Sequence, residues 1–321
     1  MGYLADERSR TRRADPRLIL PGSKSILVLA IPYSSPLPPH NPGRNRSQKK
    51  NDPVPEAEVD RGRVAAYAWG TDYHKILPRR LQALAEFIQE RAEKPVSYRC
   101  YTDTGPILER DLAQRAGLGW IGKNTCLINP KRGSYFLLSE IFLDLALEPA
   151  PPFATDQCGT CTRCIKACPT ECILPDRTID AGRCISYLTI ELKDDIPPEL
   201  RPLAGDWVFG CDICQMVCPW NRFAAPEGDP DLTPRDDRYH PLLNQELELT
   251  PEEFNRKFKN SPIQRAKRRG YLRNVSVVLG NEGKTGDIPE LEKALKDAEP
   301  LVREHAAWAI ERITQRHLNH E

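Results

Sequence analysis

Eight of the nine cysteines from Cys158 to Cys218 constrain this chain more than any other feature of its sequence. They form two sets, and each set includes a cysteine that directly precedes a proline. The sets are Cys158, Cys161, Cys164 and Cys168, then Cys184, Cys211, Cys214 and Cys218. Three cysteines at the spacing of the first set bind one 4Fe-4S cluster, and the cysteine before the proline binds a second cluster. The pattern therefore predicts two clusters that exchange ligands, in a chain that transfers electrons.

A zinc site and a disulfide framework are the alternatives for these cysteines. Structural zinc takes four ligands, usually as two separated pairs, which fits the spacing less well. Disulfides at this density belong to oxidising compartments, but the chain has an odd number of cysteines, 11, and no apolar signal segment near Met1. Cys100, Cys126 and Cys172 are interpreted as small buried apolar residues. Because Cys172 is so close to the first set, a ligand role for it stays open.

Length and composition allow two or three domains. The chain has 321 residues, of which 40% are hydrophobic, enough for buried cores. Its net charge of +1 provides no overall attraction for nucleic acid, so any such site must be a local patch. No apolar run approaches the roughly 20 residues of a transmembrane helix. We expect a soluble cytoplasmic protein without membrane contact, since thiols and clusters stay reduced there.

Residues 1–150 alternate the patterns of strands and helices. The apolar run at 25–31 is typical of a strand that is buried on both faces. The pattern predicts helices at 77–91 and 106–116, and strands at 96–101, 125–128 and 135–138. We expect an α/β or α+β domain here, and the order of its strands stays open.

Proline-rich segments at 149–152 and 224–231 mark two boundaries. They divide the chain into a first domain at 1–150, a cluster domain at 151–225 and a helical region at 226–321. Apolar stripes in the last region predict helices at 272–279, 291–298 and 302–313. Short amphipathic helices in antiparallel pairs suggest a HEAT-like unit, which must pack on the body because one repeat cannot bury its own face. The whole chain is expected to be of the α+β class.

Three segments of the first domain carry candidate functional residues. Asp103 follows a predicted strand and precedes a predicted helix, where α/β proteins build sites, but it could equally cap the helix. Asp72, Tyr73 and His74 gather an acid, a phenol and an imidazole, although a lone histidine is more often structural. The glycines of residues 116–124 have the G-x-G-x-x-G spacing. They follow a helix rather than open one, which argues against a nicotinamide site.

A basic segment without any acidic residue lies between Arg256 and Arg273. It contains eight Lys and Arg residues, with Phe258 and Tyr271 among them. In a nearly neutral protein, this local excess favours contact with a phosphate backbone over a merely solvated helix face.

Six stretches of the sequence together resemble the epoxyqueuosine reductases, the cobalamin-dependent enzymes that complete queuosine synthesis on tRNA. The stretches are AWGTDYHKIL (68–77), YTDTGPILERDLAQRAGLGWIGKNT (101–125), CGTCTRCIKACPT (158–170), RCISYLTIE (183–191), GCDICQMVCPWN (210–221) and SPIQRAKRRGYLRN (261–274). They occur in the family's order and cover most of the chain from about Pro21 onward. The family usually carries an additional helix and strand before the segment that begins here at Met1.

The resemblance implies an N-terminal α/β cobalamin-binding domain, a ferredoxin-like domain with two 4Fe-4S clusters and a HEAT-like helical part. One cluster would be bound by Cys158, Cys161, Cys164 and Cys218, and the other by Cys168, Cys184, Cys211 and Cys214. Cys172 is outside this pattern. Residues implied near the corrinoid are Asp72, Tyr73, His74, Asp103, Leu127, Leu138 and Asp212. Residues expected to hold tRNA phosphates are Arg265, Lys267, Arg268, Arg269 and Arg273.

The implied reaction removes the epoxide oxygen of epoxyqueuosine, at the wobble position of a tRNA anticodon loop, as water. It uses two electrons and two protons, which suits two one-electron clusters that feed a corrinoid. Asp103 matches the family's proton donor, and burial should raise its pKa so that it is protonated near neutral pH. Since Asp212 lies beside a cluster ligand, that cluster should face the corrinoid, and the other should face an external electron donor. The modified base is expected to be splayed out of the loop.

We expect the protein to be a monomer. Two other functions stay open. A reductive dehalogenase-like corrinoid enzyme would act on a small molecule, but it would usually carry a twin-arginine signal, and Arg12-Arg13 lacks the apolar stretch that must follow. Such an enzyme would not need the basic helical tail. A non-enzymatic electron-transfer subunit would not explain about 150 residues of N-terminal domain.

Overall fold

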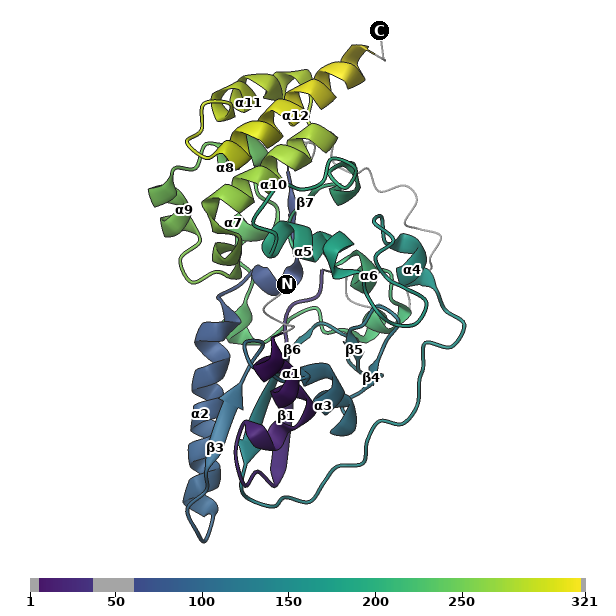
Figure 1. The fold of residues 1–321 in the computed structure, drawn as a ribbon, viewed down its shortest axis with the longest axis vertical. Coiled ribbons are helices and arrows are strands. Elements are labelled where there is room, and N and C mark those ends of the chain that lie inside the picture. The colour runs from purple at the N-terminus through teal and green to yellow at the C-terminus, as the bar shows by residue number, and fades with distance from the viewer. Residues whose placement is uncertain (1–5, 37–60, 319–321) are drawn as a thin grey trace.

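The protein is described from a computed structural model that covers residues 6–36 and 61–318. In Figure 1 the N-terminal sheet lies at one end of the long axis, the C-terminal helices lie at the other, and the cysteine-rich segment lies between them. Within the described ranges, no helix is long and apolar enough to cross a membrane.

A three-stranded antiparallel sheet forms the centre of the N-terminal part. Its order is β1 (Ser25–Pro32), β6 (Phe136–Leu143) and β3 (Tyr98–Tyr101), and β6 runs antiparallel to both neighbours. The long helix α2 (Tyr73–Arg91) lies beside β3 in Figure 1 and packs on one face of the sheet. Helix α3 (Glu109–Arg115) packs on the other face, next to the cluster around the fully buried Phe142.

The antiparallel order corrects the expectation of an α/β domain at the N-terminus, so both this part and the whole chain are α+β. The strand at 25–31 is present, but most of its residues are only half-buried. The prediction of burial on both faces is wrong because β1 is an edge strand of a small sheet.

Two helices of this part begin at unexpected residues. Helix α2 begins at Tyr73, four residues earlier than predicted, because the side chain of Asp72 accepts the backbone N–H of His74 and caps the helix. Helix α3 begins at Glu109, later than predicted, because the chain continues in bends from residue 102 to residue 107. Gly117 ends α3 with a φ of 79°, as predicted.

Short elements build the middle of the molecule. The strand β2 (Arg63–Val64) runs parallel to β7 (Trp207–Phe209), so a segment from the N-terminal part pairs with the cysteine-rich part. The other elements here are β4 (Trp120–Ile121), β5 (Leu127–Ile128), α4 (Arg163–Ala167), α5 (Ile185–Ile190) and α6 (Ile213–Met216). The predicted linker at 149–152 has no helix or strand and is mostly exposed. The predicted boundary at 224–231 instead packs back on the sheet, since Asp229 N–H donates to Pro32 O at 2.8 Å.

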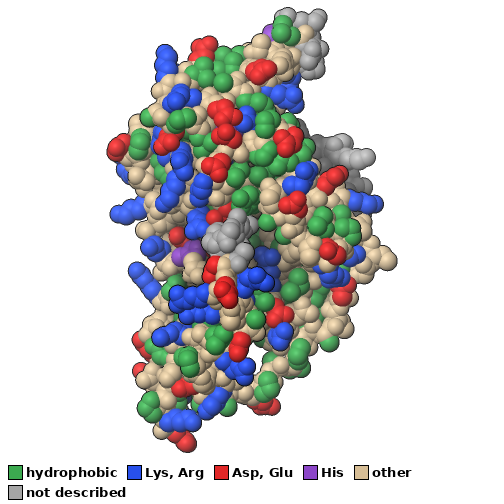
Figure 2. Space-filling view, viewed as in Figure 1, with side chains coloured by type: hydrophobic (Ala, Val, Ile, Leu, Met, Phe, Trp, Pro, Cys, Tyr) green, Lys and Arg blue, Asp and Glu red, His purple; other side chains and the backbone are tan. Residues whose placement is uncertain are grey.

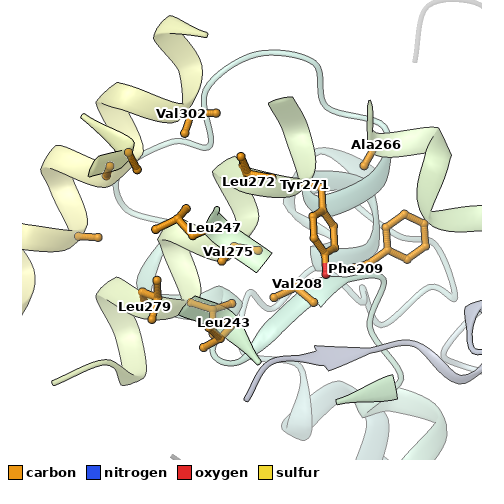
Figure 3. Packing of buried hydrophobic residues seen from close by; sticks show 14 of the residues in the cluster. Val208, Phe209, Leu243, Leu247, Ala266, Tyr271, Leu272, Val275, Leu279 and Val302 are labelled. Carbon is orange, nitrogen blue, oxygen red and sulfur yellow. The ribbon is translucent and has the colours of Figure 1, made fainter. Parts of the chain in front are cut away.

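The C-terminal helices surround α10 (Lys267–Glu282). Residues 270–280 of this helix are all buried, so the predicted single apolar stripe is wrong. The helix packs on α8 (Leu243–Leu247), α12 (Pro300–Leu318) and β7, and Figure 3 shows Leu272, Val275 and Leu279 among side chains of this core. The remaining helices are α1 (Glu7–Ala14), α7 (Asp236–Tyr239), α9 (Pro251–Lys257) and α11 (Ile288–Ala294). Because the core also contains Val64, Val208 and Phe209, the helical region is not packed independently. The HEAT-like assignment stays a prediction.

Arg273 lies inside this core rather than on a phosphate-binding surface. Its side chain is fully buried, and its guanidinium donates to the carbonyl oxygens of Leu188, Leu192 and Asp194 at 2.5–3.0 Å. Burial lowers its pKa to about 10. The expectation that Arg273 contacts nucleic acid is therefore wrong, since it joins α10 to the chain around the end of α5. Phe258 and Tyr271 are buried as well and cannot stack on bases.

We predict that Arg273→Met lowers the free energy of unfolding by about 3 kcal/mol, because several buried carbonyl groups lose their donor. Anaerobic denaturant unfolding measures this loss. The exposed neighbour variant Arg269→Met is the control and should change stability by less than about 0.5 kcal/mol. Equal stability of the two variants would contradict the structural role of Arg273.

Candidate active site and cluster-binding segment

The four cysteines of the first predicted ligand set line one pocket. Cys158, Cys161, Cys164 and Cys218 share it with Lys123, Trp220 and other residues. Burial raises the pKa of the Cys218 thiol to about 11, and the nearby Cys158 and Cys164 contribute in the same direction. The cysteine before Pro219 thus lies with the cysteines of the other run, and the predicted ligand exchange requires this proximity.

The four cysteines of the second set also lie near one another. Burial raises the pKa of Cys211, and Cys184 and Cys168 lie close enough to raise it further. Cys214 also lies close to Cys211 and Cys184. Helix α4 packs on α6, which brings the two runs together. All 11 cysteines are free thiols, so the eight of the two predicted sets are available as cluster ligands.

Two of the other three cysteines touch predicted ligands. Cys172 is buried, and its Sγ lies 3.4 Å from Cys168 Sγ. Cys126 forms a hydrogen bond with Cys214, and this bond lowers the pKa of Cys126 to about 7. The interpretation of Cys172 as a small buried residue agrees with the structure. The contact of Cys126 could not be inferred from spacing, because Cys126 is distant from Cys214 in the sequence.

Asp103 occupies a strained turn between β3 and α3. Its φ is 58°, in the left-handed region that few non-glycine residues adopt. Its carboxylate accepts a hydrogen bond from Tyr73 Oη at 2.7 Å and lies 3.5 Å from His74 Nε2. Its backbone N–H donates to Glu109 Oε1 at 2.5 Å. The side chain remains 60% exposed, so it is accessible to a substrate. The alternative that Asp103 caps α3 is wrong, because Leu108 holds that position.

The ionisation of Asp103 differs from the expected one. His74 lowers the pKa of Asp103 through hydrogen bonding, and Tyr73 acts in the same direction against the effect of burial. In return, Asp103 and Asp72 raise the pKa of His74 to about 9. The Nδ1 atom of His74 lies 2.8 Å from Asp72 Oδ1. At neutral pH the proton of this group therefore resides on His74, and Asp103 is ionised.

Asp212 directly follows Cys211 and precedes Cys214 by two residues in the sequence. Its carboxylate is buried and accepts the backbone N–H of Ala66 at 2.7 Å, and burial raises its pKa to about 6. The charge of Asp212 contributes to the raised pKa of three nearby tyrosines, Tyr33, Tyr67 and Tyr135. The buried Tyr135 hydroxyl has no hydrogen-bond partner among the described residues.

Two carboxyl groups next to the Asp103 turn, the half-buried Glu109 and the fully buried Glu140, were not identified from the sequence. Burial raises the pKa of Glu109 to about 7 and that of Glu140 to about 9. Glu140 lies in β6, is fully buried, and neither of its carboxyl oxygens has a partner in the described part of the chain. An acid within the apolar run FLLSEIFL was the available signal.

The two implied leucines hold different positions. Leu138 lies in β6, and its carbonyl oxygen accepts Thr102 Oγ1 at 3.0 Å, which ties the Asp103 turn to the sheet. Leu127 is buried in β5 opposite Ile121. Of these two leucines, Leu138 is thus the one that a hydrogen bond joins to the Asp103 turn in the described part of the chain.

The basic segment adjoins the Asp103 turn. Asp72 N–H donates to Asn260 O at 2.8 Å, and Arg265 lies close enough to Asp103 to lower the pKa of its carboxyl group. Arg265 also pairs with Glu191, at 2.9 and 3.0 Å, but remains 57% exposed. Figure 2 shows Lys and Arg side chains gathered along one side of the molecule, from the C-terminal helices toward the N-terminal part.

The other cations of this segment differ in their freedom. Lys267 and Arg269 are exposed. Arg268 is only 17% exposed, because it pairs with Asp297 and donates to Leu249 O at 2.6 Å. Lys75 and Arg79 are also exposed and lie on α2, the helix that carries Tyr73 and His74, and neither was predicted from the sequence.

Comparisons with known proteins are consistent with this arrangement. Residues 13–104 match the family described as epoxyqueuosine reductase QueG, DUF1730, and residues 157–221 match a 4Fe-4S double cluster binding domain. The chain is 44% identical over 317 residues to the epoxyqueuosine reductase of Pseudomonas aeruginosa, and the aligned region covers 97% of this chain and 82% of the relative. It is 40% identical over 304 residues to the epoxyqueuosine reductase of Escherichia coli, and the aligned region covers 95% of this chain and 76% of that relative.

Solved structures of similar proteins have the same overall fold. An epoxyqueuosine reductase from Bacillus subtilis, with its catalytic aspartate loop swung out of the active site, matches with a TM-score of 0.83 and 33% identity, over 96% of this chain and 78% of that one. An epoxyqueuosine reductase with an epoxyqueuosine-modified tRNA stem loop matches with a TM-score of 0.80 and 32% identity, over 93% of this chain and 76% of that one.

We predict that His74 titrates near pH 9 and that Asp103→Asn lowers this pKa, because one of the two carboxylates that stabilise the imidazolium is removed. Since the folded pKa lies above the unfolded value of 6.5, the pair stabilises the fold fully below pH 6.5 and loses this effect as the pH rises through 9. NMR of protein with ¹⁵N-labelled histidine measures the titration, and His74→Gln assigns the signal. An unchanged pKa in Asp103→Asn would exclude the proposed pair.

Proposed function

The chain belongs to the epoxyqueuosine reductase family and reduces epoxyqueuosine to queuosine in tRNA, and we propose that Asp103 and His74 deliver the proton for this reaction next to a corrinoid. The observation that carries the proposal is the position of the Asp103 turn. On one side the turn adjoins the basic segment around Arg265. On the other side, Tyr73 and Tyr67 lead toward Asp212 and the second ligand set. Substrate phosphate, protons and electrons can therefore meet at one place.

The electron path runs through the two cysteine groups. The 4Fe-4S double cluster domain at residues 157–221 supports iron–sulfur clusters, and we assign their ligands as the two four-thiol sets described above. The set with Cys211 and Cys214 lies beside Asp212 and the tyrosines, so we assign its cluster to the substrate side. The set that lines the pocket with Cys158 would then accept electrons from an external donor.

We propose cobalamin as the second cofactor, with Asp103 and Asp212 among the residues that would hold it. The residues present fit such a group, because the buried Tyr135 hydroxyl lacks a partner and lies close to Asp212 and Cys214. Asp212 and Asp72 would accept hydrogen bonds from amide groups at the corrinoid edge. The surrounding wall would include His74, Leu127 and Leu138. When bound, the cobalamin would supply a strongly reducing cobalt that transfers two electrons to the epoxide.

The chain's own residues handle the protons. As the epoxide opens, negative charge develops on its oxygen, and an acid within hydrogen-bond reach lowers the barrier. Asp103 is accessible but ionised, whereas His74 carries a proton and is held 3.5 Å away. We therefore assign His74 as the proton store and Asp103 as the group that passes the proton to the oxygen. Two electrons and two protons remove this oxygen as water and leave a carbon–carbon double bond.

The rest of the chain would bind and place the tRNA. Arg265, Lys267 and Arg269 would hold phosphates, while Arg268 supports them from its pair with Asp297. We further propose that the C-terminal helices form a HEAT-like unit. The protein would work as a monomer in the cytoplasm and receive electrons from an external donor. The alternative of a small-molecule dehalogenase is not favoured, because the relatives of this chain are epoxyqueuosine reductases.

We predict that Asp103→Asn lowers turnover of epoxyqueuosine-containing tRNA by about 100- to 10,000-fold, because an amide cannot pass the proton. Iron content and tRNA affinity should remain normal. Asp111→Asn, which alters an exposed aspartate on α3, is the matched control. Single-turnover assays with pre-reduced enzyme measure the rate, and near-normal turnover in Asp103→Asn would remove Asp103 from the proton path.

We predict that the triple variant Arg265→Ala, Lys267→Ala, Arg269→Ala weakens tRNA binding. It should reduce the slope of log affinity against log salt by about one for each lost phosphate contact. The control triple is Lys94→Ala, Lys296→Ala, Arg312→Ala, which removes the same charge from exposed positions elsewhere. Filter binding across a salt series measures both. Equal slopes for the two triples would place the tRNA on another surface.

A further inference from the structure

The glycine-rich segment at 116–124 has a role other than nucleotide binding. It forms β4, which pairs with β5, and it lies against the loop that carries the first cysteine run. Its glycines allow close backbone contact within the protein. A Cβ on Gly119 would lie 2.1 Å from Ile128 O, so no side chain fits there. The segment is therefore shaped for packing, and two of its other side chains reach the cysteine loop.

Trp120 reaches a predicted cluster ligand directly. The residue is 1% exposed, and its indole Nε1–H donates to Cys158 Sγ at 3.4 Å. Its ring stacks on Phe153, with centroids 5.7 Å apart, and meets Trp220 edge-on at 5.1 Å. Because both neighbours restrict the ring, the N–H is held in the direction of the sulfur.

Lys123 holds the backbone of the same loop. Its Nζ donates to Gly159 O at 2.7 Å and to Cys161 O at 3.0 Å. The segment is also fixed from the far side, since Arg177 donates to Ile121 O at 2.9 Å. One N–H donor and one positive charge from the glycine-rich segment thus converge on the Cys158–Cys161 loop.

We propose that Trp120 and Lys123 raise the reduction potential of the first cluster, the one that Cys158, Cys161, Cys164 and Cys218 would bind. Reduction adds an electron to a group that is already negative, because four thiolates bind it. A hydrogen bond to a ligand sulfur and a nearby cation both stabilise this added charge, and hydrogen bonds to sulfur are an established control of cluster potentials.

The proposal gives the two clusters different tasks. Within the described residues, no tryptophan N–H or lysine contacts a sulfur of the second set. The side-chain neighbours of these sulfurs include the thiols of Cys126 and Cys172 and the hydroxyl of Thr170. A higher potential favours electron entry at the first cluster from a moderately reducing donor. The inference rests on the ligand assignment proposed above.

The test is a redox titration of the holoenzyme followed by EPR. Trp120→Phe keeps an aromatic ring and removes the N–H donor. We expect the potential of one cluster to fall, so that its reduced-to-oxidised ratio at a fixed potential drops by about threefold to tenfold. A tenfold change corresponds to about 59 mV for one electron. Trp220→Phe is the matched control, because Trp220 lines the same pocket but donates to the carbonyl oxygen of Gln157.

A second pair of variants covers the case in which Trp120→Phe loses its clusters. Lys123→Met should lower the potential of the same cluster, Lys123→Arg should restore part of it, and the exposed Lys131→Met should have no effect. The inference would be overturned if Trp120→Phe or Lys123→Met, with full iron content, left the potentials of both clusters unchanged. Equal shifts of the potential in the test and control variants would overturn it as well. These outcomes leave the proposed function intact. Wild-type protein without two clusters would instead refute the ligand assignment itself.

Discussion

The packing of α4 on α6 is the constraint on which the rest of the structure depends. Each helix follows cysteines of one run, and their contact brings Cys218 to the first run and Cys168 to the second. Thiols in this arrangement repel as their charges develop, so the gathering needs a rigid surround. The middle of the molecule provides this rigidity. There, β2, which precedes α2, pairs with β7, which precedes Cys211.

Buried polar side chains connect this middle part to the C-terminal helices. Asn274 on α10 donates to Thr189 O and Val208 O, both at 2.8 Å, and Arg273 donates to three carbonyl groups around the end of α5. Each bond satisfies a backbone group that burial would otherwise leave without a partner. The basic segment before this helix is thereby fixed relative to the cysteine groups, and its Arg265 lies close to Asp103.

The Asp103 turn is held from several sides. Tyr73 binds the carboxylate, Glu109 binds the backbone N–H, and Thr102 is tied to Leu138. A φ of 58° at Asp103 is sustained only because these contacts outweigh its strain.

The sequence alone determined the local features whose signal lies in spacing: the cysteine runs, the strand at 25–31, the end of α3 at Gly117 and the candidate residues Asp72, Tyr73, His74 and Asp103. Only the tertiary structure decided which charged groups are free, because burial depends on what packs from distant segments. Arg273 and Arg269 lie four residues apart in one basic run, yet the first is inside the core and the second is exposed. The same reason explains why the pKa of Asp103 is lowered rather than raised, and why Trp120 meets Cys158, since in each case the deciding partner comes from another part of the chain.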